Sequence, residues 1–247
     1  MCPERRLGPP PPPCQRNLYR KGRPSFHFFI EEIANDVPQL RGPLVHLGVL
    51  APRGVLRWFK AGQALDSEGV QVHEYLVFPD CQSVVVKLRE GRFEIKAILA
   101  AAQPLSLDLG IKGRTDPWVK WSFASESLQT LDPALHQSGL WLKVRKERFL
   151  RKFSADTGHL VEFSAPPGSF PGSWINIELA RIEGEVNPRS WFSLGFEAFG
   201  PPAVANKILL DALRLLFEDL GRVPGISLRE DNSLHYPAWL AKLVQTL

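Results

Sequence analysis

Charged residues recur at every second position in several segments of this chain, and this spacing is suited to binding a polyanion. The pairs are Lys87 with Arg89, Glu94 with Lys96, and Lys143 with Arg145. Side chains alternate between the two faces of a β-strand, so the members of each pair share a face. Lysine and arginine bind phosphate oxygens, and arginine can do so through two parallel hydrogen bonds. The spacing therefore predicts a phosphate-binding surface.

Carboxylates occur with the same alternation later in the chain. Glu178 and Glu197 lie on the polar faces of two otherwise apolar segments, 173–183 and 190–199. Carboxylate oxygens are ligands that Mg²⁺ and Mn²⁺ accept, and such an ion can polarise a phosphoryl oxygen and position a water molecule. We expect Glu94, Glu178 and Glu197 to bind the metal, and Glu94 and Lys96 to take part in catalysis. The residues expected to bind phosphate are Lys87, Arg89, Lys143, Arg145 and Arg148.

Two arrangements of these strands fit the pattern. A solvated sheet face also alternates lysine with glutamate, and ion pairs across neighbouring strands are common there. However, the charged strands are numerous, and their opposite faces are rich in Val, Ile, Leu and Phe that must be buried. This combination favours a sheet curled around a charged interior. If the acids and bases of that interior neutralise each other, the same fold predicts a non-catalytic binding or assembly protein.

The elements that must position these residues are mainly strands. Segments rich in Val, Ile, Phe and Trp, separated by Gly, Pro, Asp and Asn, are typical of strands. The expected strands cover 26–33, 43–50, 54–60, 71–78, 82–89, 92–99, 117–123, 139–153, 159–164, 173–183 and 190–199. Helices are expected at 201–220 and 233–246, and a further one at 126–136. The fold class is therefore α+β, with an antiparallel barrel or tunnel of about eight or more strands and C-terminal helices.

The chain divides into a short leader and one domain. The sequence has 247 residues and a net charge of +4, and residues 1–24 carry six basic residues against one acidic residue. The leader also contains Pro9 to Pro13, a run that favours extended polyproline II structure and does not pack into a core. Residues 1–24 are therefore expected to be a disordered basic leader. Residues 25–247 are expected to form a single β-tunnel domain with helical buttresses at 201–220 and 233–246.

Composition excludes several other classes of protein. No run of about 18 apolar residues is present, so no membrane span is expected. The N-terminus lacks the apolar core of a secretory signal, and three unpatterned cysteines point to a reducing cytoplasm. No glycine-rich phosphate loop precedes a helix, and the six histidines show no metal-binding spacing. Nothing in the pattern indicates an oligomeric state.

The order of these short motifs resembles the CYTH, or triphosphate tunnel, superfamily. The resemblance spans roughly residues 25–220. It rests on Val-Lys-Leu-Arg, a tight turn and Phe-Glu-Ile-Lys at 86–96, then on Trp-Leu-Lys-Val-Arg-Lys at 141–146, and on the later Ile-Glu-Leu and Leu-Gly-Phe-Glu-Ala-Phe. It implies an eight-stranded antiparallel tunnel that binds and hydrolyses a triphosphate or other phosphoanhydride with a divalent metal, so a small polyphosphate or nucleotide is the expected partner.

The first strand departs from the pattern of that superfamily. The superfamily carries Glu-x-Glu-x-Lys on one strand face, whereas Glu31 and Glu32 are adjacent here, so they fall on opposite faces, and no lysine follows. A metal site built from this strand is not expected, and the chain can keep the tunnel without the catalysis.

A second motif uses some of the same residues. Pro79-Asp80, then thirteen intervening residues, and then Glu94-Ile95-Lys96 match the PD-(D/E)xK pattern of metal-dependent nucleases. In such an enzyme Asp80 and Glu94 hold Mg²⁺, Lys96 helps to activate water, and nucleic acid is the partner. A tight hairpin at Glu90-Gly91-Arg92 would separate Asp80 from Glu94 by roughly 26 Å along the strand, at the usual rise per residue.

Overall fold

The computed structural model describes residues 20–31, 53–61, 67–78, 80–124, 141–155, 159–164, 172–184, 190–200 and 202–245. They form a ten-stranded, antiparallel sheet with helices, so the α+β class and the antiparallel sheet are confirmed. The strands are β1 (Arg20–Glu31), β2 (Val70–Leu76), β3 (Val84–Arg89), β4 (Arg92–Ile98), β5 (Gln103–Leu107), β6 (Ile111–Ala124), β7 (Trp141–Ser154), β8 (Val161–Glu162), β9 (Trp174–Gly184) and β10 (Ser190–Phe199). The helices are α1 (Arg53–Lys60), α3 (Pro202–Leu220) and α4 (Tyr236–Gln245), with short 3-10 turns at Asp108–Gly110 and Glu230–Asn232.

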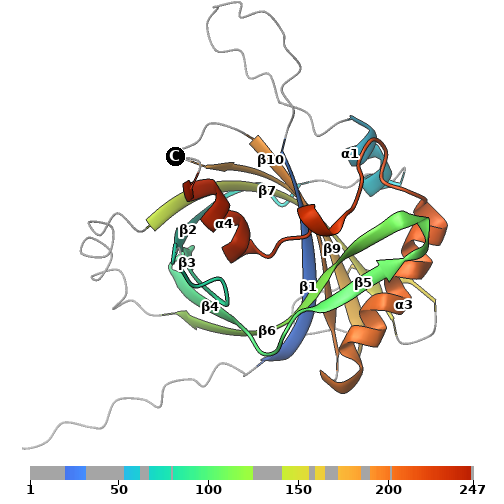
Figure 1. Cartoon of the computed structure of the whole chain (residues 1–247), viewed down its shortest axis with the longest axis horizontal. Coiled ribbons are helices and arrows are strands. Elements are labelled where there is room, and N and C mark those ends of the chain that lie inside the picture. The colour runs from blue at the N-terminus through green and yellow to red at the C-terminus, as the bar shows by residue number, and fades with distance from the viewer. Residues whose placement is uncertain are drawn as a thin grey trace, which may run out of the picture.

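The sheet curves strongly, so that its strands surround α4 (Figure 1). The strand order is β1-β10-β9-β7-β2-β3-β4-β6-β5, and β8 pairs with β7. In addition to β10, β1 pairs with β6, with Ser25 opposite Asp116 in the register. A strand that pairs on both of its edges brings β10 and β6 near each other. The sheet therefore has a concave face turned toward α4 and a convex face turned outward.

The β3–β4 hairpin sets the register of the charged strands. Its loop has two residues, Glu90 and Gly91, with φ angles of 50° and 70°. Two consecutive left-handed residues are typical of the type I′ turn, whose twist matches that of the flanking strands. As a result Lys87 lies opposite Glu94, and Arg89 lies opposite Arg92.

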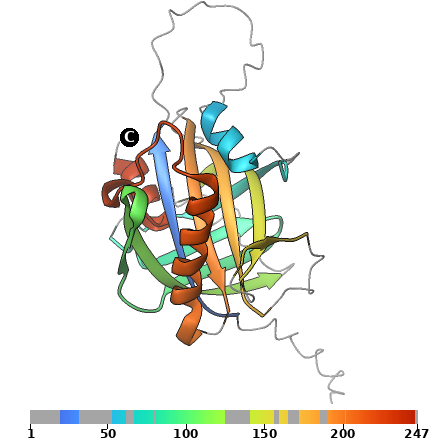
Figure 2. The ribbon, with the colours of Figure 1, turned by 90° about the vertical axis from the view of Figure 1, so that its right-hand side faces the viewer.

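The convex face of the sheet is covered by α1 and α3, which pack on β7, β9 and β10 (Figure 2). Alternate residues of β9 and β10 face these helices and form the core there: Ile175, Ile177, Leu179, Phe192, Leu194, Phe196 and Ala198. The buried residues of α3 follow a helical stripe that includes Leu209, Leu213 and Leu216. The expected apolar faces of the segments 173–183 and 190–199 are thus confirmed.

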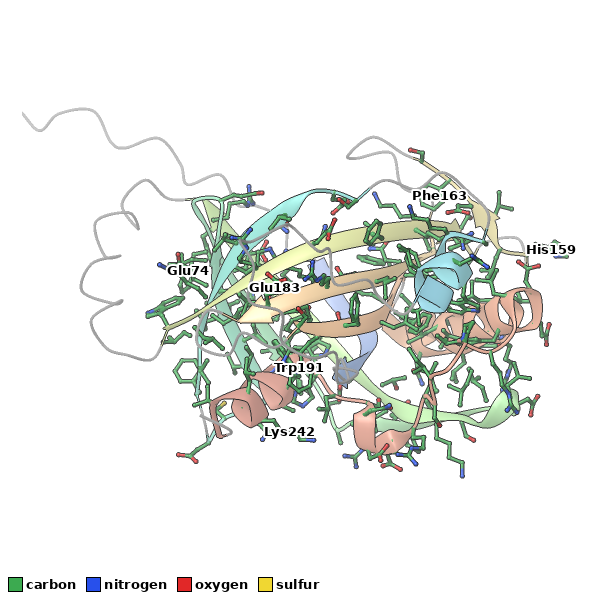
Figure 3. All side chains as sticks on the ribbon, turned by 90° about the horizontal axis from the view of Figure 1, so that it is seen from above. Glu74, His159, Phe163, Glu183, Trp191 and Lys242 are labelled. Atoms are coloured by element: carbon green, nitrogen blue, oxygen red, sulfur yellow. The ribbon has the colours of Figure 1, made fainter. Side chains whose placement is uncertain are left out.

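A second apolar core lies on the concave face, against α4. Trp239, Leu240 and Leu243 of this helix contact buried residues from five strands: Tyr75, Val85, Trp118, Leu142, Val144, Ala180 and Ile182. Figure 3 shows Trp191 beside α4 and Lys242 on the side of the helix turned away from the strands. The helix expected at 233–246 is present as α4, but it lies within the curve of the sheet and does not buttress it from outside.

Most expected strands are present, and the largest error concerns residues 54–60. This segment was expected to be a strand, but it forms α1. Val55, Trp58 and Phe59 are buried at helical spacing, and the Trp58 indole donates hydrogen bonds to backbone carbonyls at the C-terminal end of α3, which decides the conformation.

Several other expectations differ from the structure or lie outside it. β5 was not anticipated; among the described strands it pairs with β6 alone, and its Pro104 suits such an edge strand. β1 begins at Arg20, so residues 20–24, assigned above to the leader, belong to the strand. The expected strand at 43–50, the expected helix at 126–136, residues 1–19 and Glu32 lie outside the described residues. Within the described part, no helix has both the length and the apolar content that crossing a membrane requires.

Candidate anion-binding site

Glu94 is the centre of an ion cluster on the concave face. Its side chain is only 3 % exposed, and its two oxygens contact Lys87 Nζ at 2.8 Å and Lys120 Nζ at 2.7 Å. These residues come from β4, β3 and β6, three strands that are neighbours in the sheet. One carboxylate therefore holds two lysines from the strands on either side of it.

Burial and charge shift the proton affinities of this cluster in opposite directions. Burial alone would raise the pKa of Glu94, but Lys87 and Lys120 outweigh it and hold that pKa well below its usual value. Burial lowers the pKa of Lys87 to about 7, although Glu94 acts against the shift. The pKa of Lys120 is also lowered by burial. Strong shifts of this kind at a cluster of charges are frequent at functional sites.

A second ion cluster joins β7 to β9 and α4. Lys146 Nζ lies 2.6 Å from Glu178 Oε1 and donates a hydrogen bond to the Tyr236 hydroxyl, also at 2.6 Å. Arg148 reaches the other oxygen of Glu178 at 3.4 Å and also binds the more exposed Glu68. Tyr236 is the first residue of α4, so this cluster ties the helix to the concave face.

Lys96 and Glu197 make a third, looser contact. Their closest nitrogen and oxygen atoms are 3.6 Å apart, and both side chains are more than a fifth exposed. The contact links β4 to β10, which lie on different sides of the curved sheet. Solvent therefore reaches this part of the concave face.

Two arginines face each other where the β3–β4 hairpin begins. Arg89 and Arg92 are directly opposite in the register, and both continue the row of alternate residues that carries Lys87 and Glu94. In the described part of the chain, the Arg92 guanidinium donates to the Ser122 hydroxyl at 3.0 and 3.2 Å. Arg89 donates to Gln71 at 3.4 Å, and the carboxylate of Glu90 is 3.7 Å away. Neither guanidinium has a tightly bound carboxylate among the described residues.

His73 lies between the clusters on β2. It is 1 % exposed, and its ring nitrogens contact the Gln71 side-chain oxygen and the Tyr75 hydroxyl, each at 3.3 Å. Burial lowers the pKa of His73, and the positive charges of Lys87, Lys146, Arg89 and Arg148 lower it further. The histidine is therefore neutral and is surrounded by cations from both neighbouring strands.

Among the described residues, these contacts join seven basic side chains and five carboxylates. The basic residues are Lys87, Arg89, Arg92, Lys96, Lys120, Lys146 and Arg148. Glu94, Glu178 and Glu197 are the acids on the strands, and the more exposed Glu68 and Glu90 lie in loops. Of the residues expected from the sequence, Lys87, Arg89, Glu94, Lys96, Arg148, Glu178 and Glu197 thus share one face, as expected.

Lys143 and Arg145, which were expected to bind phosphate, do not lie on the concave face with the other expected residues. Both side chains are exposed, whereas Leu142 and Val144 are buried and pack with α4. The concave face near α4 is apolar, so the residues of β7 that point inward there are the apolar ones. Because the alternation continues along the strand, Lys146 and Arg148 share the inward face with Val144.

The carboxylates of the concave face do not fit a metal site. The oxygens of Glu94 and Glu178 are held by lysine and arginine, and Glu197 contacts Lys96. Among the described residues, no group of three or more His, Cys, Asp or Glu side chains is placed to hold an ion. We therefore derive no step through a metal held by these residues.

The nuclease motif is not brought together either. Asp80 is exposed in the connection before β3. Glu94 is buried and lies opposite Lys87, and Lys87 is seven residues beyond Asp80 in the sequence. Glu94 already holds two lysines. Asp80 and Glu94 therefore do not face a common ion in the described structure.

Sequence reasoning missed several residues of the site. They are Lys120, Lys146, Arg92, His73, Gln71, Tyr75 and Tyr236. Lys120 could have been placed on this face because it is two residues from Trp118 on the same strand. Arg92 could have been placed there from the register of the hairpin. Tyr236 had no such signal, because nothing in the sequence places α4 on the concave face.

A scan against protein-family models found no match, and neither did a search of curated proteins. The site must therefore be interpreted from its own geometry.

Proposed function

We propose that the protein binds a triphosphate or another linear phosphoanhydride on the concave face, with the sheet acting as a tunnel around the ligand. The single observation that carries the proposal is the arginine pair at the hairpin. Like charges directly opposite each other on neighbouring strands are unfavourable unless something neutralises them. An anion placed between Arg89 and Arg92 would supply that charge and accept bidentate hydrogen bonds.

The surrounding charges support the same ligand class. Lys87 follows the arginine pair along the same strand face, and the partly exposed Lys96 and Lys120, opposite each other, lie further along that face, so a chain of phosphates could meet several cations in succession. A single orthophosphate would reach fewer of them. The three carboxylates already pair with cations, as the non-catalytic alternative expects, so we propose binding as the core function. We place it in the cytosol, as the few unpatterned cysteines suggest.

Calorimetric titration of the full chain with tripolyphosphate tests the proposal. We expect saturable binding of tripolyphosphate that is much tighter than that of orthophosphate, and that weakens as salt increases because charge dominates it. A short nucleic-acid duplex serves as the control polyanion, since it separates binding of a linear phosphoanhydride from binding of polyanions in general. Phosphate release, measured with Mn²⁺ present, tests the hydrolysis that the superfamily resemblance implies. No binding of tripolyphosphate, or equal binding of the duplex, would contradict the proposal.

A further inference from the structure

The hydrogen bonds of His73 define which of its nitrogens carries the proton. The Gln71 side-chain atom that contacts His73 Nε2 also accepts a hydrogen bond from Arg89, so this atom is the oxygen. An oxygen of an amide only accepts, and Nε2 of His73 therefore carries the hydrogen. Nδ1 is then the acceptor, and the Tyr75 hydroxyl donates to it. Burial raises the pKa of Tyr75, so this hydroxyl keeps its proton.

The same two partners could also hold a charged histidine. If Nδ1 gained a proton, it could donate to the Tyr75 oxygen once the hydroxyl hydrogen rotates away. Nε2 would continue to donate to Gln71. His73 can therefore become an imidazolium without losing a hydrogen bond and without any movement of the backbone.

Burial opposes the second proton most strongly by lowering the pKa of His73, and the positive charge of the surroundings lowers that pKa further. The neighbours on β3 are Lys87 and Arg89, and those on β7 are Lys146 and Arg148. On the remaining side, Tyr75 stacks on Tyr236 of α4, with the ring centroids 5.8 Å apart. The charges that act most strongly on His73 are thus all positive. An anion with three or more charges bound among these residues would reverse the local potential.

We propose that His73 takes up a proton from solvent at Nδ1 when a polyanion binds on the concave face, and so serves the site as an imidazolium. This inference rests on the proposed function and adds to it a charge-dependent specificity. A highly charged phosphoanhydride offsets the repulsion from the cations, whereas a small monoanion does not. The added positive charge then strengthens binding of the ligand that induced it.

Proton uptake can be measured directly with the full chain. Tripolyphosphate is titrated calorimetrically in buffers of different ionisation enthalpy, because the dependence of the observed heat on the buffer gives the number of protons taken up. We expect the wild type to take up more protons than His73→Gln, by up to one. The matched control is His159→Gln, which changes an exposed histidine and should leave the number unchanged.

The pH dependence has a defined sign. A group that gains a proton on binding strengthens binding as the pH falls, by up to about tenfold per pH unit for one proton. Between pH 8 and 7, the affinity of the wild type for tripolyphosphate should therefore rise more steeply than that of His73→Gln. Equal slopes and equal proton numbers in the two proteins would overturn the inference.

A second measurement keeps the inference testable if His73→Gln does not fold. The ring proton signals of the histidines in the wild type are followed by NMR while tripolyphosphate is added at pH 7.5. One buried histidine should move to the chemical shift of an imidazolium. If tripolyphosphate binds and no histidine changes its charge, the inference fails while the proposed function stands. If tripolyphosphate does not bind at all, the proposed function itself fails.

Discussion

Replacing Glu94 with glutamine is expected to lower the free energy of unfolding by about 3 kcal/mol, because it leaves the half-buried Lys87 and Lys120 without their shared counter-charge. The carboxylate is 3 % exposed and contacts both Lys87 and Lys120 within 2.8 Å. Urea denaturation at pH 7 measures the change. The matched control is Glu90→Gln in the hairpin loop, where the carboxylate is 59 % exposed and 3.7 Å from Arg89. This exposed pair should contribute at most about 1 kcal/mol.

The same variant tests whether an external anion can replace the lost carboxylate. Glu94→Gln has one more uncompensated positive charge on the concave face than the wild type, so tripolyphosphate should raise its melting temperature by more than that of the wild type. A ligand that binds only the folded state stabilises it in proportion to its affinity. A destabilisation below about 1 kcal/mol, or an equal response of both proteins to tripolyphosphate, would contradict this account of the cluster.

Acid should reproduce part of the effect of this substitution. Lys87 and Lys120 hold the pKa of Glu94 below its usual value against the effect of burial. A depressed carboxylate pKa stabilises the fold above the unfolded value of about 4.3, and this stabilisation is lost as the pH falls through the folded value. The difference in stability between the wild type and Glu94→Gln should therefore shrink progressively below a pH of about 4.

Replacing Arg89 with glutamine is expected to weaken tripolyphosphate binding roughly ten- to a hundredfold. A hydrogen bond to a charged group contributes about 1.5–3 kcal/mol, and 1.4 kcal/mol corresponds to a factor of ten in affinity. The fold should survive, because Arg89 contacts Gln71 and the exposed Glu90, and its loss leaves no buried carboxylate unpaired. Calorimetric titration of the two proteins under the same salt conditions measures the change.

The control for Arg89 is the same substitution on the convex face. Arg145 is an exposed arginine of β7, and Arg145→Gln changes the net charge of the chain by the same amount. Its effect on affinity should be less than about twofold, because an exposed and distant charge is screened by salt. If both variants lost affinity equally, binding would depend on net charge alone, and the concave face would not be the site.

Alternation along a strand predicted the faces of β9 and β10 but not that of β7. Ile175, Ile177 and Leu179 of β9, like Phe192, Leu194 and Phe196 of β10, form apolar rows at alternate positions, so the polar residues Glu178 and Glu197 lie on the other face. Residues 143–148 of β7 carry charges at both odd and even positions, interrupted only by Val144. Such a run does not indicate which charges point inward. The packing of α4 against Val144 determines which side chains of β7 point inward.

The location of α4 also explains why the ion clusters could not be completed from sequence. The apolar residues Trp239, Leu240 and Leu243 indicate that this helix is buried, but they do not indicate on which face of the sheet. Tyr236 reaches Lys146 only because α4 lies within the curve of the strands. The β3–β4 hairpin, in contrast, is a local structure. Its turn residues and alternation were sufficient to predict the row from Lys87 to Lys96.

The most direct test of the central claim is the crystal structure of the full chain with tripolyphosphate bound. The account predicts phosphate groups on the concave face, between Arg89 and Arg92 and within hydrogen-bonding distance of Lys87. Phosphates bound instead to the exposed Lys143 and Arg145 of β7, with the ion clusters of the concave face unchanged, would contradict it.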